Sequence, residues 1–88
     1  MEKSKIFNKL KGVIADVIGL EEGEVKPESH FINDLGCDSI LLSELIMTIE
    51  DKFGFRITDQ DAAKLRTVND VVEYIHSIKI WQKFIIFI

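Results

Sequence analysis

Ser39 and its neighbours are the residues whose types and spacing point most directly to covalent chemistry. The serine lies where a glycine-containing loop gives way to a helical pattern, in the run Asp34-Leu35-Gly36-Cys37-Asp38-Ser39-Ile40. At such a boundary the hydroxyl faces solvent, and the N-terminus of the following helix offers free N–H groups and a positive dipole end, which suit a phosphodiester. No general base adjoins Ser39 in sequence, as an activated nucleophile would require. Ser39 therefore suits modification by a separate enzyme, although a plain helix cap is the simplest interpretation of an isolated serine.

Cys37, His30 and His76 are the other side chains with nucleophilic or metal-binding chemistry. Their separations match no zinc-binding pattern, so we expect no metal site. We interpret Cys37 as a small packed or half-exposed thiol. A single cysteine also excludes an internal disulfide and gives no sign of an oxidising compartment.

Two long helices are expected to flank the loop that contains Ser39. Apolar residues recur at three- and four-residue spacing over residues 3–18, which predicts the first helix, and a long connection over residues 19–37 follows. The second helix is predicted to begin near Asp38 or Ser39 and to end at about Phe53. The residues expected to pin the long connection to the core are Val25, Phe31, Ile32 and Leu35.

Two capping patterns predict the remaining helices. Thr58 and Asp61 precede a short third helix over residues 59–65, and Thr67 and Asp70 precede a fourth. No strand signal of comparable strength is present. The predicted fold class is therefore all-α, a four-helix bundle with a long first loop and a short third helix. The expected core positions of the second and fourth helices are Leu42, Leu45, Ile46, Ile49, Phe53, Val68, Val71, Val72, Ile75 and Ile78.

One face of the second helix lies opposite its apolar stripe and combines apolar with acidic residues. We call it the docking face, and it comprises Ile40, Glu44, Met47, Glu50 and Asp51. A charged run is by default a solvated surface, but apolar residues rimmed by acids suggest a partner with a basic surface. The net charge is −4. The central acids are Asp34, Asp38, Glu44, Glu50, Asp51, Asp59 and Asp61, against Lys52 and Arg56. This balance argues against a nucleic-acid partner.

From about Ile6 to Ile78 the chain resembles the acyl carrier proteins. The run around Ser39 is similar to their attachment motif, D-L-G-x-D-S-L, and the resemblance extends to the downstream segments Glu44-Leu45, Glu50-Asp51-Lys52-Phe53-Gly54 and Thr67-Val68-Asn69-Asp70. It implies that Ser39 carries covalent 4′-phosphopantetheine from coenzyme A and that Asp38 is recognised by the phosphopantetheinyl transferase. It also implies that the docking face binds basic patches on partner enzymes. Leu41 and Lys52 depart from the family's acidic pattern, which predicts weaker electrostatic and more apolar docking.

The function implied by this resemblance is that of a carrier, not an enzyme. We expect a cytoplasmic monomer that presents acyl chains as thioesters to the enzymes of fatty acid synthesis, and a phosphoprotein in the sense of its phosphodiester link. Polyketide or peptidyl carriers are the alternative within the same class, although peptidyl carriers usually have a second glycine, and often a histidine, near this serine. An unmodified helical adaptor that binds partners through the docking face is the alternative from another class.

The last ten residues, 79–88, are far more apolar than the preceding chain. We therefore divide the sequence into an acyl carrier domain, 1–78, and an apolar C-terminal tail, 79–88. A bilayer span needs about 20 residues, so the tail is too short to cross one. Folding back onto the bundle and partial order are the favoured interpretations, and membrane contact through Lys79 and Lys83 is the third. Fold-back predicts blue-shifted Trp81 fluorescence and a lower melting temperature after deletion of residues 80–88.

Overall fold

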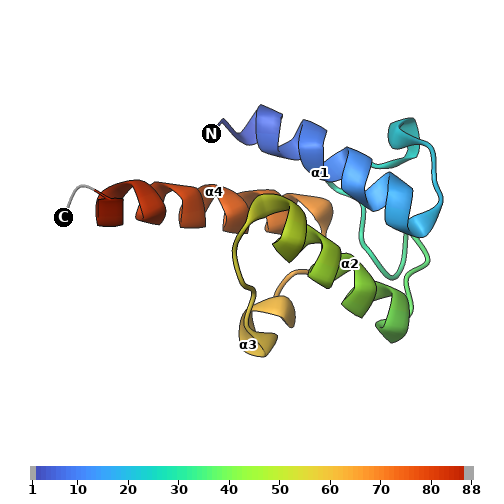
Figure 1. Ribbon diagram of the computed structural model, residues 1–88. Helices are drawn as coiled ribbons and strands as arrows, with labels where there is room; N and C mark the ends of the chain where they lie inside the picture. Colours follow the sequence, from blue (N-terminus) through green and yellow to red (C-terminus); the bar gives the residue numbers. More distant parts are fainter. Residues whose placement is uncertain (1, 87–88) are drawn as a thin grey trace.

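The computed structural model describes residues 2–86, including the side chains of residues 2–78, and its regular elements are all helical (Figure 1). They are α1 (Lys3–Ile18), the 3-10 helix η1 (Glu22–Glu24), α2 (Ser39–Phe53), α3 (Asp59–Ala62) and α4 (Val68–Ile86). No β-strand forms within the described residues, where an isolated antiparallel bridge joins His30 to Thr67. The predicted all-α, four-helix class is confirmed.

The core lies where α1 packs against both α2 and α4. Because apolar residues recur with the helical period, each helix buries one stripe. The fully enclosed side chains include Ile6, Leu10, Ile14, Leu45, Ile49, Val68, Val71 and Ile75. Three residues of the predicted stripes, Leu42, Ile46 and Ile78, are only half-buried because they lie at the margin of this core.

The long connection between α1 and α2 is held down by apolar side chains, as expected. Val25, Phe31 and Leu35 are buried, but Ile32 is 55% exposed, so the expectation that it pins the loop is wrong. The N–H of Ile32 donates to His30 Nδ1 at 3.3 Å in a local turn of the chain. The sequence pattern also did not predict η1, whose capping box pairs Glu21 with Glu24.

Side-chain caps define α3 and α4, but only one of the two predicted capping boxes is complete. At α4, Thr67 Oγ1 accepts the Asp70 N–H at 3.2 Å and Asp70 Oδ2 accepts the Thr67 N–H at 3.0 Å. At α3, Thr58 Oγ1 accepts the Asp61 N–H at 3.1 Å, but the Asp61 carboxylate accepts from Tyr74 instead of returning a bond to Thr58.

The third helix is shorter than predicted. It ends at Ala62 instead of residue 65, and the chain then tightens, with the Leu65 N–H donating to the Ala62 carbonyl at 3.1 Å. The Arg66 N–H donates to Asp70 Oδ2 at 3.0 Å, which begins the approach to α4. The backbone N–H of Arg66 thus bonds to the cap of α4 and does not continue the hydrogen-bond pattern of α3.

The Tyr74 hydroxyl ties α3 to α4 by donating to Asp61 Oδ2 at 2.8 Å. The Tyr74 ring also lies 6.0 Å from the Phe55 ring, measured between centroids. Burial, followed by the hydrogen bond to Asp61 and the charges of Asp61 and Glu50, raises the pKa of Tyr74 from 10.0 to about 12. The hydrogen bond is therefore present at neutral pH, and its contribution to stability is lost only as the pH rises from 10.0 toward 12.

Tyr74→Phe is expected to loosen α3 without disturbing the core. Loss of one hydroxyl that donates to a carboxylate should lower the free energy of unfolding by about 1–2 kcal/mol at pH 7. Amide hydrogen exchange should accelerate in α3 more than in α1 or α2. Urea unfolding and exchange mass spectrometry measure the two effects, and unchanged exchange in α3 would show that the bond does not hold that helix.

The described backbone of the apolar tail is helical and continuous with α4, which extends to Ile86 (Figure 1). The boundary proposed at residue 78 thus falls inside a helix. The side chains from residue 79 onward lie outside the described residues, as do residues 87–88 altogether, so fold-back and Trp81 burial stay predictions. Among residues 2–86, no helix has both the length and the apolar character needed to cross a membrane.

Candidate functional site

The loop before α2 is built by hydrogen bonds that set the direction in which the chain enters the helix. The His30 carbonyl accepts from the N–H groups of Asp34, at 2.9 Å, and Leu35, at 3.0 Å. Gly36 follows with φ 72°, a left-handed conformation that costs other residues about 1–2 kcal/mol. The Cys37 N–H then donates to the Phe31 carbonyl at 2.9 Å. This fixed turn delivers Asp38 and Ser39 to the start of α2.

Asp38, not Ser39, is the N-cap of α2. Asp38 Oδ1 accepts the Leu41 N–H at 2.7 Å, and the Asp38 carbonyl accepts the Leu42 N–H at 2.9 Å. Ser39 is the first residue inside the helix, and its exposed hydroxyl has no hydrogen-bond partner among the described residues. The interpretation of Ser39 as an ordinary side-chain cap is therefore wrong, and its hydroxyl is available to another molecule.

The N-terminal end of α2 is suited to hold a phosphodiester attached to Ser39. The N–H groups of Ser39 and Ile40 belong to the first helical turn, where no intrahelical acceptor exists. They point outward at the positive end of the helix dipole, which favours phosphate oxygens. The nearby Ser43 hydroxyl donates to the Ser39 carbonyl at 2.9 Å and so does not compete for the site. An exposed serine oxygen beside free amide donors can thus hold the attachment end of a phosphopantetheine group.

Cys37 is packed, as expected, and is poorly suited to act as a nucleophile. Its side chain is 4% exposed. Burial, and to a lesser extent the negative charge of Asp38, raises the pKa of the Cys37 thiol above its usual value of 9.0. Because the thiolate is the reactive form, this shift lowers the reactive fraction of Cys37 at neutral pH. Across the described residues, no three His, Cys, Asp or Glu side chains are grouped as a metal site would require.

The docking face is presented to solvent on α2, opposite the buried Leu45 and Ile49. Ile40 is 76% exposed and Met47 is 66% exposed, both unusual for large apolar side chains of a small bundle. Glu44 and Asp51 are also exposed. Glu50 differs, because it is half-buried and its Oε2 accepts the Ile57 N–H at 2.8 Å. One of the five residues in this face therefore also holds the loop after α2.

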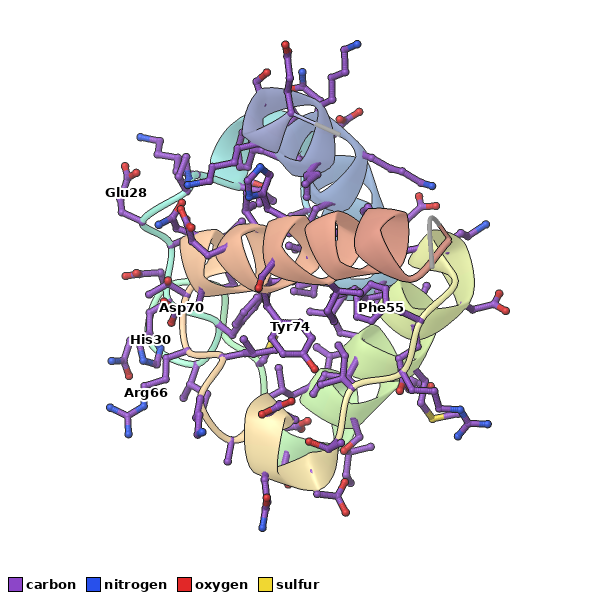
Figure 2. The ribbon with its side chains drawn as sticks, turned by 90° about the vertical axis from the view of Figure 1, so that its left-hand side faces the viewer. Glu28, His30, Phe55, Arg66, Asp70 and Tyr74 are labelled. Atoms are coloured by element: carbon purple, nitrogen blue, oxygen red, sulfur yellow. The ribbon has the colours of Figure 1, made fainter. Side chains whose placement is uncertain are left out.

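Two residues that the sequence pattern did not assign to a site, His30 and Arg66, lie together near α2. The antiparallel bridge and a 3.0 Å bond from the Phe31 N–H to the Arg66 carbonyl bring their backbones side by side. Figure 2 shows both side chains on the same side of the molecule. They are too far apart in sequence for any spacing rule to link them, so only the fold places them together.

A comparison with protein families matches this chain to one of them. The model described as the phosphopantetheine attachment site covers residues 8–75, well over half of the 88 residues. The matched region runs from α1 to the middle of α4 and includes the loop, Asp38, Ser39 and the docking face.

Proposed function

Since the chain belongs to the family of phosphopantetheine-binding carrier proteins, we propose that Ser39 is its attachment residue and that its cargo is the growing acyl chain of fatty acid synthesis. Proteins of this family carry acyl or peptidyl groups as thioesters on covalently attached 4′-phosphopantetheine, and the carrier domain is not itself catalytic. The observation that supports Ser39 most is its exposed, unpartnered hydroxyl at the start of α2, beside a cap supplied by Asp38.

The residues of this chain bind and orient, and the transferase supplies the chemistry of loading. Ser39 Oγ forms the new bond to phosphorus as the P–O bond within the pyrophosphate of coenzyme A breaks and adenosine 3′,5′-bisphosphate leaves. The serine proton goes to a base of the transferase, because no base among the described residues contacts the hydroxyl. The free first-turn N–H groups of Ser39 and Ile40 stabilise the phosphate that results. The attached group supplies a terminal thiol on a flexible arm, which carries the thioester.

The docking face supports delivery to enzymes with basic surfaces. Its exposed Ile40 and Met47 provide apolar contact, and Glu44 and Asp51 lie on the same side of α2. Long-range attraction between opposite charges raises the association rate more than it raises the affinity. Family members interact with phosphopantetheinyl transferases and synthesis enzymes, and we propose that this surface is where this chain does so.

Glu44→Lys is expected to slow loading by the transferase, and the defect should be larger at low salt than at high salt. The charge reversal turns attraction into repulsion, and salt screens exposed charges beyond about 10 Å at 0.1 M. Initial rates across a salt series measure the effect. The matched control is Glu28→Lys, which makes the same charge change at an exposed loop residue outside the docking face. Equal slowing by the two variants would assign the effect to net charge and contradict the docking face.

Reconstitution separates fatty acid synthesis from the other carrier roles. Loaded protein is supplied to a dissociated fatty acid synthesis system, and elongation of its thioester is followed by mass spectrometry. We expect elongation through repeated rounds. Loading without elongation there, combined with acceptance by polyketide or peptide-forming enzymes, would instead assign the chain to that branch. Absence of any loading would leave the helical adaptor as the function.

A further inference from the structure

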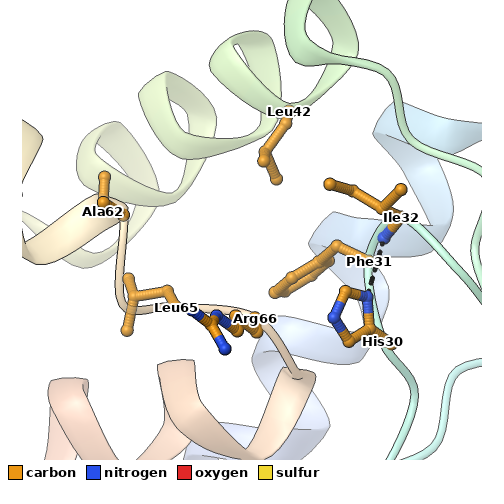
Figure 3. Close-up of a pocket in the computed structure, with 8 residues that line it drawn as sticks. His30, Phe31, Ile32, Leu42, Ala62, Leu65 and Arg66 are labelled. Carbon is orange, nitrogen blue, oxygen red and sulfur yellow. Dashed lines mark hydrogen bonds between the residues drawn. The ribbon is translucent and has the colours of Figure 1, made fainter.

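A pocket of about 320 Å³ lies beside α2 (Figure 3). Its apolar walls come from Phe31 in the long loop, Leu42 on α2, and Ala62 and Leu65 around α3. Leu42 is three residues after Ser39, so the two lie about one helical turn apart. A group on a flexible arm from Ser39 is therefore attached about one helical turn from the wall of this pocket.

One edge of the pocket is polar, and Arg66 forms part of it. Arg66 is exposed, and its guanidinium has neither a hydrogen bond nor an ion pair with any described residue. The backbone at this point is nevertheless fixed, because its carbonyl accepts from Phe31 and its N–H donates to Asp70. The five N–H donors of this guanidinium thus have no acceptor among the described residues, and Arg66 lines the pocket.

His30 forms the adjoining part of the polar edge in a defined tautomer. Its Nδ1 accepts the N–H groups of Ile32 and Asn33, each at 3.3 Å. A ring nitrogen that accepts carries no proton, so the neutral ring has its N–H at Nε2. Figure 3 shows the ring lying next to Arg66, with Nδ1 turned toward Ile32. The Nε2–H is therefore a second donor without an acceptor at the same edge.

Two acids beside these segments, Asp34 and Asp70, are already engaged by the backbone. Asp34 Oδ2 accepts the His30 N–H at 2.7 Å. Asp70 Oδ2 accepts the backbone N–H groups of Arg66 and Thr67. Burial raises the pKa of the Asp70 carboxyl, but the hydrogen bonds from Thr67 and Arg66 and the positive charge of Arg66 outweigh burial and hold that pKa below its usual value. Neither carboxylate pairs with the Arg66 guanidinium or the His30 ring. The side-chain donors thus remain free to take an acceptor from outside the chain.

We propose that this pocket receives an acyl cargo that carries a carboxylate, with its chain against Phe31, Leu42 and Leu65 and its carboxylate held by Arg66 and His30. A planar guanidinium fork matches a carboxylate in two-bond geometry, which an apolar chain end cannot use. A purely apolar pocket would give no preference between the two cargoes. This inference rests on the proposed attachment at Ser39 and adds a second class of cargo, acyl chains that end in a carboxylate, to the methyl-ended chains of fatty acid synthesis.

The test compares two six-carbon cargoes loaded from their coenzyme A thioesters onto the full chain, hexanoyl and 5-carboxypentanoyl. Cleavage of each thioester by hydroxylamine is measured and divided by the rate for the same thioester of free pantetheine. We expect the carboxylated cargo to be cleaved about fivefold more slowly than hexanoyl, the upper range for an exposed ion pair. Arg66→Gln should remove this protection and leave the hexanoyl rate unchanged. The protection should also weaken as salt is added.

Two further variants separate the polar edge from general effects. His30→Asn keeps an acceptor near the position of Nδ1 but lacks the Nε2–H, so it should lose part of the protection. Arg56→Gln removes an exposed arginine that does not line this pocket and should lose none. Equal protection of both cargoes in the wild-type protein, or equal loss with Arg56→Gln, would overturn the proposal.

The phosphodiester of the arm is the other anion that could reach Arg66. In nitrogen–proton NMR spectra the Arg66 Nε–H resonance should move when 5-carboxypentanoyl replaces hexanoyl. If the Arg66 Nε–H resonance moves when the apo protein is converted to the holo form and does not move again on acylation, Arg66 binds the phosphate of the arm. That result would refute the proposed cargo. Failure of Ser39 to load at all would refute the proposed function, and is recognised before either cargo is compared.

Discussion

Replacing Ser39 with alanine is expected to abolish loading completely while leaving the fold intact. The substitution removes the only atom through which the group is proposed to attach, so no residual rate should remain. Because Asp38 supplies the cap of α2 and the Ser39 hydroxyl has no partner among the described residues, the free energy of unfolding should change by no more than about 0.5 kcal/mol. Intact mass after incubation with coenzyme A and transferase measures loading, and urea unfolding measures stability.

The matched control for Ser39→Ala is Ser43→Ala, one helical turn further along α2. Ser43 is also exposed, but its hydroxyl donates to the Ser39 carbonyl and it lies outside the first turn. This variant should load like the wild-type protein. Loading of the Ser39 variant, or loss of loading in the Ser43 variant with α2 still folded, would place the attachment elsewhere.

Leu45→Ala is expected to have a large effect on stability. Leu45 is fully enclosed in the core, and truncation of a buried leucine costs about 2–5 kcal/mol through lost burial and a residual cavity. Domains are typically stable by only about 5–15 kcal/mol, so a large part of the stability of this small bundle should be lost. Urea denaturation followed by circular dichroism gives the value directly, and a loss below 1 kcal/mol would contradict the placement of Leu45 in the core.

Met47→Ala, two residues further along the same helix, should show the opposite behaviour. Met47 lies on the docking face, so its truncation should change the free energy of unfolding by no more than about 0.5 kcal/mol. If it is an apolar contact with partner enzymes, loss of about 1 kcal/mol of binding should slow loading roughly fivefold at limiting concentration. A stable variant that loads at the wild-type rate would show that Met47 is exposed without being a contact.

The long helices could be predicted from the sequence because their signals are local. The periodic apolar residues of α1 lie within one segment, and Gly19 and Gly54 end α1 and α2 where predicted. The end of α3 depends instead on distant residues. Arg66 is drawn away from that helix by Asp70 on α4 and by Phe31 in the first loop, and no pattern within residues 59–65 shows this.

The candidate site divides in the same way. The run around Ser39 is contiguous, so its chemistry and its place at a helix start were predictable. The sequence could not show whether Asp38 or Ser39 caps the helix, because both residue types are good caps. Only the folded geometry shows that the Asp38 carboxylate accepts the Leu41 N–H. The pairing of His30 with Arg66 depends on an isolated bridge between distant segments, which leaves no periodic signal.

The most direct test of the central claim is to map the attachment residue in the wild-type protein. After incubation with coenzyme A and a phosphopantetheinyl transferase, the chain should gain the mass of a single phosphopantetheinyl group. Tandem mass spectrometry of the peptide containing the Asp38-Ser39 pair should place that mass on Ser39. An unchanged intact mass, or a modification located on any other residue, would contradict the assignment of this protein as a carrier that works through Ser39.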